Sequence, residues 1–78
     1  MFLQRLKDLR EDKDKTQKEI AEEVLHCQRT VYRRYERAEH AIPAWVVATL
    51  ADYYGVSADY ILELTDDPKP YKRIQRKK

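Results

Sequence analysis

The sequence contains a single glycine, Gly55, and three prolines among its 78 residues. Folds with many strands need frequent tight turns, which glycine and proline supply. This chain lacks that turn chemistry, so the sequence predicts an all-α fold. Its length allows one domain around one small core.

Apolar residues recur at helical spacing in five segments, which predicts a compact five-helix bundle. We expect helices over residues 2–12, 17–25, 28–37, 43–54 and 58–64. From residue 65 the helical pattern stops, so residues 65–78 are expected to form a basic, mostly flexible tail. The first helix should bury Phe2, Leu3, Leu6, Leu9 and Arg10, and the last should close the core with Tyr60, Ile61 and Leu64.

Several residues suit the ends of these helices. Thr16 is an N-cap candidate, and Glu19 three residues later completes a capping box. Pro43 fits the first turn of the fourth helix, where its missing N–H costs nothing. Gly55 fits the left-handed position that ends that helix, and Ser57 can cap the fifth.

Residues 28–38 divide into two halves when they are placed on a helix at the usual turn angle. Like charges four residues apart repel one another, so a helix gains nothing by lining up its own arginines. A bound polyanion would remove this repulsion. One half carries Val31, Tyr32, Tyr35 and Ala38, and the opposite half carries Arg29, Thr30, Arg33, Arg34 and Arg37.

A protruding helix of this width fits the major groove of duplex DNA. Arginine can donate two hydrogen bonds to guanine, Gln28 can pair with adenine, and Thr30 can contact a thymine methyl group or a phosphate. Gln17 begins the preceding helix, where free N–H groups favour a phosphate. Two helices in this order, the second of them exposing polar side chains, predict a helix-turn-helix that binds DNA.

Charge is unevenly distributed along the chain. Residues 38–67 contain no lysine or arginine, whereas residues 68–78 contain no acid. The basic end is interpreted either as an electrostatic arm on DNA or as a solubilising end. Trp45, Val46 and Tyr53 are candidates for a self-association surface, although Trp45 could equally cover the core.

The segments TQKEIAEEVLHC, QRTVYRRYERAE, IP and LADYYGVSADYIL together resemble the lambda-repressor/Cro-like (XRE) helix-turn-helix domains. The resemblance covers about residues 3–64 and implies a five-helix domain that binds operator DNA as a dimer, usually to repress transcription. It implies a structural ion pair between Arg10 and Glu36, which would explain an arginine on the apolar face of the first helix. The implied phosphate and recognition contacts are Gln17, Gln28, Arg29, Thr30, Arg33 and Arg34.

The sequence departs from this family pattern in three places. The stretch from Ala21 to Tyr35 is one residue longer than usual, which predicts a longer second helix or a reshaped turn. The turn around His26 lacks a glycine. Ala38 replaces the frequent glycine of ERG, and a left-handed backbone there would cost about 1 kcal/mol.

Other functional classes receive little support from the residues. The single cysteine, Cys27, excludes an intramolecular disulfide and is interpreted as a half-buried turn residue in a reducing compartment. No nucleophile–base pair, glycine-rich phosphate loop or zinc spacing is present, so we expect no enzyme, cofactor or metal site.

The sequence therefore predicts a DNA-binding domain over residues 1–64 and a tail over residues 65–78. We expect a cytoplasmic regulator from a bacterium or phage, with no membrane span, acting as a homodimer on a palindromic operator. The alternative is an antitoxin or another interaction module that holds a partner protein with its acidic half.

Overall fold

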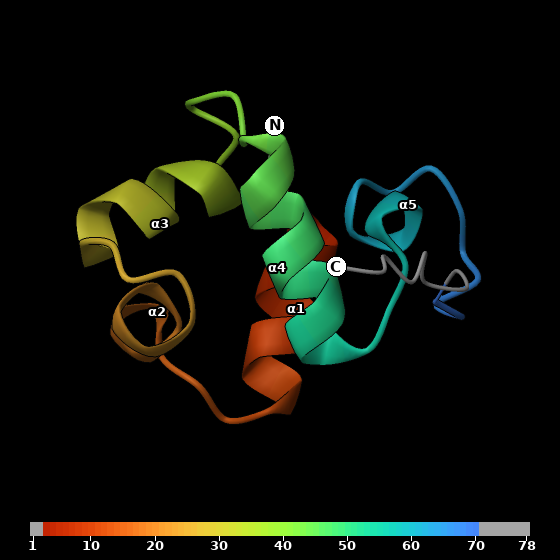
Figure 1. The fold of residues 1–78 in the computed structure, drawn as a ribbon, viewed down its shortest axis with the longest axis horizontal. Helices are drawn as coiled ribbons and strands as arrows, with labels where there is room; N and C mark the ends of the chain where they lie inside the picture. The colour runs from red at the N-terminus through yellow and green to blue at the C-terminus, as the bar shows by residue number, and fades with distance from the viewer. Residues whose placement is uncertain (1–2, 71–78) are drawn as a thin grey trace, which may run out of the picture.

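The computed structural model describes residues 3–70, so the expected burial of Phe2 lies outside this range (Figure 1). Within it the chain is helical and contains no strand, so the predicted all-α fold is confirmed. The helical segments, of which α2 and η1 form one continuous helix, are α1 (Gln4–Asp12), α2 (Gln17–Glu19), η1 (Ile20–Val24), α3 (Arg29–Glu36), α4 (Ala44–Tyr54) and α5 (Ala58–Ile61).

Every helix of the bundle contributes at least one fully buried side chain to the core. These include Leu6 of α1, Ile20 of η1, Tyr32 of α3, Leu50 of α4 and Ile61 of α5. Helix α4 runs through the centre of the molecule, with α3 on one side and α5 on the other (Figure 1). Burial of these apolar surfaces is the main force that holds the short helices together.

The predicted caps are present. Thr16 Oγ1 accepts a hydrogen bond from Glu19 N at 3.1 Å, and Glu19 Oε1 accepts one from Thr16 N at 2.9 Å. This backbone hydrogen bond lowers the pKa of Glu19, since it favours the ionised carboxylate. Ser57 Oγ accepts from Tyr60 N at 3.0 Å, and Gly55 ends α4 with φ 68°.

Two predicted details of the C-terminal half are wrong. Pro43 stands just before α4 instead of in its first turn, and its carbonyl oxygen accepts from Val46 N and Val47 N. Leu64 does not close the core, because 72% of its surface is exposed. The reason is that α5 ends at Ile61, so Leu64 lies beyond the helical face that packs inward.

The helix before α3 ends in a π-helical turn, in the stretch where the sequence predicts one extra residue. Leu25 N donates to Ile20 O at 3.1 Å, five residues back, and Cys27 N donates to Ala21 O at 2.8 Å. A π turn holds one residue more than an α turn, so it can accommodate the predicted extra residue by widening the end of the helix. The chain then reverses at His26, whose φ is 53°. Of the two predicted outcomes, the structure shows the reshaped turn.

Residues with positive φ follow the ends of the helices, and within residues 3–70 four of them are not glycine. Asp14, His26, Ala38 and Glu63 have φ between 53° and 62°. At Ala38 the backbone forms a Schellman motif, in which Ala38 N donates to Tyr35 O and Glu39 N to Arg34 O. The expected left-handed geometry is therefore kept at Ala38, with a side chain that disfavours it.

A buried ion pair joins α1 to α3. Arg10 Nε lies 2.7 Å from Glu36 Oε2, and only 4% of the Glu36 surface is exposed. Hydrogen bonding to this carboxylate raises the pKa of Arg10 above its ordinary value. Arg10 also donates to Lys15 O at 2.9 Å, and Leu3 N donates to Glu36 O at 2.9 Å. The ion pair and the Leu3 backbone hydrogen bond together fix the two ends of α1 relative to α3.

Residues 65–70 run beside α5 on the side of the molecule away from α3 (Figure 1). Arg5 donates to the backbone oxygens of Tyr60 and Thr65 and forms an ion pair with Asp66. Ser57 N donates to Pro68 O at 3.2 Å. The first part of the predicted tail is therefore bonded to the helical domain, and residues 71–78 lie outside the described range.

Replacing Ala38 with glycine should raise the free energy of unfolding by about 0.5–1 kcal/mol, because glycine adopts positive φ without the Cβ penalty. Ala48→Gly is the matched control, since Ala48 is an exposed residue inside α4. At Ala48 the same substitution should lower the free energy of unfolding by about 0.5–1 kcal/mol. Urea denaturation measures both. A loss of stability in Ala38→Gly would contradict the assigned strain.

Arg10→Ala should lower the free energy of unfolding by about 3 kcal/mol, because it leaves the Glu36 carboxylate buried without its partner. The control is Lys15→Ala, whose ammonium group lies 3.8 Å from the exposed Glu23. Its effect should stay below about 1 kcal/mol. Thermal unfolding followed by circular dichroism measures the difference, and equal effects of the two changes would refute the structural role of the pair.

Candidate nucleic-acid interface

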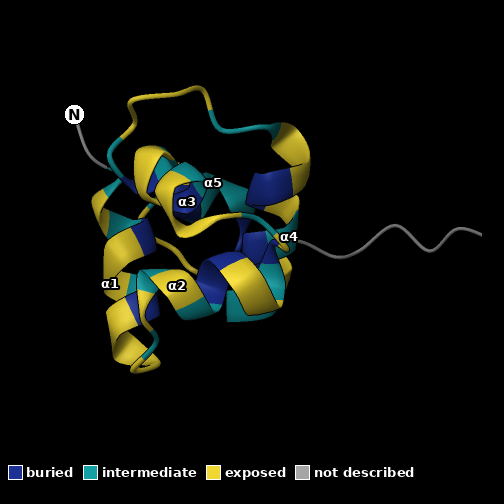
Figure 2. Cartoon of the chain, turned by 90° about the vertical axis from the view of Figure 1, so that its left-hand side faces the viewer, coloured by how far each residue is buried: buried dark blue, intermediate teal, exposed yellow. Residues whose placement is uncertain are grey.

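Helix α3 presents a polar and positively charged face to solvent. It follows the α2–η1 helix after the turn at residues 25–28, and Figure 2 looks onto this side of the molecule. Gln28 precedes α3, and its side chain makes no capping hydrogen bond with the helix. The exposed side chains are Gln28, Arg29, Thr30, Arg33 and Arg34, and Arg37 is half-buried.

The opposite face of α3 explains why these residues point outward. Tyr32 and Glu36 are buried one turn apart, and Val31 and Tyr35 flank them in half-buried positions. Burial raises the pKa of Tyr32, and the nearby Glu36 carboxylate adds to the shift. Because the buried Tyr32 and Glu36 fix how α3 is rotated about its own axis, the side that carries the arginines must face solvent.

Gln17 lies between two surface hollows that bring the predicted residues together. The first, of about 350 Å³, is lined by Gln17 with Arg33 and Arg37. The second, of about 820 Å³, is lined by Gln17 with Arg29. The start of α2, two arginines of α3 and Arg37 just after α3 therefore border two hollows that share Gln17. Such a surface suits a chain of phosphates that passes along α3.

Two of the predicted arginines are engaged within the chain. Arg37 Nε lies 3.1 Å from Glu39 Oε2, which offsets part of its charge. Arg34 Nη1 lies 3.4 Å from His40 Nε2, in a separate hollow that Gln17 does not line. The structure thus groups Arg29 and Arg33 with Gln17 and places Arg34 on another side of α3.

Besides Arg10, two residues of α1 line the first hollow, and neither was among the contacts expected from the sequence. They are Gln4 and Lys7, of which Gln4 Nε2 donates to Asp8 Oδ1 at 2.9 Å. The sequence spacing already indicates that Lys7 shares a face of α1 with Arg10, because the two lie about one helical turn apart. Once Arg10 is paired with Glu36, Lys7 must lie beside the last turn of α3.

The expected self-association surface is only partly exposed. Trp45 is 57% exposed, whereas Val46 is completely buried, so the prediction for Val46 is wrong. Val46 follows Trp45 by one helical step, which turns it into the core. Tyr53 is half-buried, with its ring 5.0 Å from that of Tyr54 and beneath the Lys13 ammonium group.

Cys27 is half-buried in the turn between η1 and α3, where it packs against the core. Burial raises the pKa of its thiol, which disfavours the reactive thiolate. This environment fits the expectation of a packed turn residue. No helix among residues 3–70 is long and apolar enough to cross a membrane.

Comparison with known proteins agrees with this geometry. Residues 2–64 match the family described as "Helix-turn-helix domain". The chain is 39% identical over 77 residues to a Bacillus subtilis (strain 168) protein named "Uncharacterized HTH-type transcriptional regulator YobD". The alignment covers 99% of this chain and 66% of that relative. No solved structure gives a significant match. The resemblance seen in the sequence is confirmed, and the chain belongs to the helix-turn-helix domain family.

Proposed function

We propose that this chain binds double-stranded DNA at particular sequences and regulates transcription, with α3 in the major groove. The exposed arginine face of α3 beside Gln17 carries the proposal. Within residues 3–70, no carboxylate forms an ion pair with Arg29 or Arg33, so both can bind an external anion. The family membership and the name of the relative support the same function.

In this proposal the α2–η1 helix and α3 constitute the helix-turn-helix. Gln17 contacts a backbone phosphate, because it stands at the start of the first helix. Gln28 and Arg33 extend toward base edges, where an amide suits adenine and a guanidinium group suits guanine. Thr30 contacts a thymine methyl group or a phosphate, and Arg29 pairs with the backbone. Arg34 and Arg37 add positive charge at the margins.

We further propose that two copies bind a palindromic operator in the cytoplasm and repress transcription. Exposure of the large apolar Trp45 side chain supports association, since a solvated tryptophan is costly unless a partner covers it. Residues 1–64 form the DNA-binding domain in this proposal, and residues 65–78 form its basic extension.

A second candidate is an interaction module that binds a different protein. It is favoured by the composition of residues 38–67, which carry no lysine or arginine and expose Leu62 and Leu64 as well as Trp45. A chain that is monomeric alone and co-purifies with a basic partner would support this candidate. A homodimer that binds duplex DNA would support the first proposal.

Arg33→Ala should weaken binding to the best duplex selected from a random library by about 10-fold or more, since one good side-chain contact to a base contributes roughly 1–3 kcal/mol. The control is Lys13→Ala, which removes one charge from the end of α1 next to Tyr53. Mobility-shift titrations at several salt concentrations give both affinities. Equal affinities of the two variants, or no duplex preferred over bulk DNA, would count against the proposal.

Trp45→Ala should raise the dimer dissociation constant by roughly 30-fold, as expected when an interface loses a tryptophan anchor worth about 2 kcal/mol. Trp45→Phe should retain most of the association, because it keeps a large apolar side chain. Sedimentation equilibrium measures the constants, with circular dichroism to verify folding. A wild-type protein that stays monomeric at high concentration would exclude the homodimer.

A further inference from the structure

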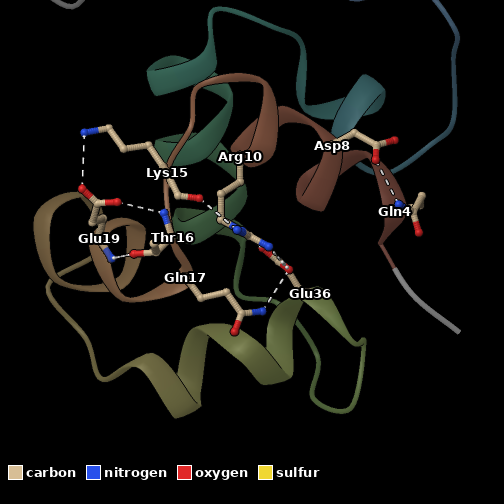
Figure 3. Close-up of polar contacts among 8 residues, drawn as sticks. All are labelled: Gln4, Asp8, Arg10, Lys15, Thr16, Gln17, Glu19 and Glu36. Carbon is tan, nitrogen blue, oxygen red and sulfur yellow. Dashed lines mark hydrogen bonds and ion pairs between the residues drawn. The ribbon is translucent and has the colours of Figure 1, made fainter.

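The side-chain amide of Gln17 has a defined orientation in the free protein. Gln17 Nε2 lies 3.1 Å from Glu36 Oε1, and the contact is drawn in Figure 3. A carboxylate can only accept hydrogen bonds, so the NH₂ end of the amide must face Glu36. One of its two N–H groups is used in this contact. The other N–H and the amide oxygen remain for a ligand.

The Glu36 carboxylate, which accepts this hydrogen bond, is in turn held by Arg10 of α1. Arg10 Nε and Nη2 donate to the two oxygens of Glu36 at 2.7 and 3.3 Å. The carboxylate is nearly excluded from solvent, which strengthens these hydrogen bonds and restricts its rotation. Figure 3 shows the chain of contacts from Arg10 through Glu36 to Gln17. A rigid acceptor of this kind fixes the glutamine that hydrogen-bonds to it.

We propose that Glu36 is a positioning residue that orients Gln17 for its contact with a DNA phosphate, an inference that rests on the proposed function. Gln17 lies on the boundary of the two hollows lined by Arg29, Arg33 and Lys7. A phosphate drawn in by these cations meets an amide whose free N–H is already oriented. Without Glu36 the side chain must be ordered during binding, which weakens affinity by roughly two- to tenfold.

The orientation can be measured in the wild-type protein without DNA. One Gln17 side-chain amide proton should exchange with solvent about tenfold more slowly than those of Gln28, because it is hydrogen-bonded. Gln28 is the matched reference, since it is exposed and its side chain makes no capping hydrogen bond. Nuclear magnetic resonance of side-chain amides gives both rates. Similar rates at Gln17 and Gln28 would overturn the proposal, and this measurement does not depend on the stability of a variant.

The functional consequence is tested by a double-mutant cycle on DNA affinity. Gln17→Ala should weaken binding to the selected duplex about five- to tenfold in the wild-type background, the effect of one hydrogen bond to a charged group. In the Glu36→Gln background the same change should cost less than about twofold. The substitution replaces one of the two acceptor oxygens by an NH₂ donor, and Arg10 holds the remaining oxygen, so the Gln17 NH₂ group loses its acceptor. Affinities are measured at a temperature where circular dichroism shows every variant folded.

Arg33→Ala provides the control cycle. Arg33 is exposed on α3, and within residues 3–70 its side chain makes no hydrogen bond to the Gln17 amide, so its effect should be the same with and without Glu36→Gln. If Gln17→Ala weakens DNA binding equally with and without Glu36→Gln, Glu36 does not position Gln17 and its role is purely structural. If the wild type binds no duplex specifically, the proposed function fails instead, and the exchange rates alone then decide whether Glu36 orients Gln17.

Discussion

The buried ion pair between Arg10 and Glu36 determines how α3 is placed on the rest of the bundle. Water solvates charges so well that two of them are buried together only when their geometry is nearly complete. Here the carboxylate receives hydrogen bonds from Arg10 and from Gln17, and the same guanidinium group donates to Lys15 O. One carboxylate therefore connects α1, the loop before α2, the start of α2 and α3. The exposed arginines face outward because this connection and Tyr32 hold the inner side of their helix.

Much of the fold was predictable because its determinants are local. Caps such as Thr16 with Glu19, and the left-handed Gly55, depend on a few neighbouring residues, and these were identified from the sequence alone. The burial of Val46 and the exposure of Leu64 were not, since they depend on where α4 and α5 lie and where α5 ends. Likewise, residue spacing indicated an insertion before α3, but only backbone hydrogen bonding shows that it forms a π turn.

Some features of the candidate interface were likewise predictable from the sequence, and others were not. Periodicity along α3 suffices to separate Arg29 and Arg33 from Tyr32, because all three belong to one helix. Periodicity cannot show that Arg34 lies beside His40, or that Lys7 of α1 joins the surface next to Gln17. Those relations are set by packing between helices. The family resemblance supplied the pairing of Arg10 with Glu36, which composition and spacing alone did not establish.

The hydrogen bond from Ser57 N to Pro68 O affects where this domain can be cut. A polypeptide trimmed after residue 64 would keep every helix, yet it would lose the acceptor of the Ser57 amide and two of the groups that bind Arg5. A buried N–H group that loses its acceptor destabilises the folded protein, because it is no longer hydrogen-bonded to water either. Residues 65–70 therefore contribute contacts to the helical domain, although they lie past its last helical turn.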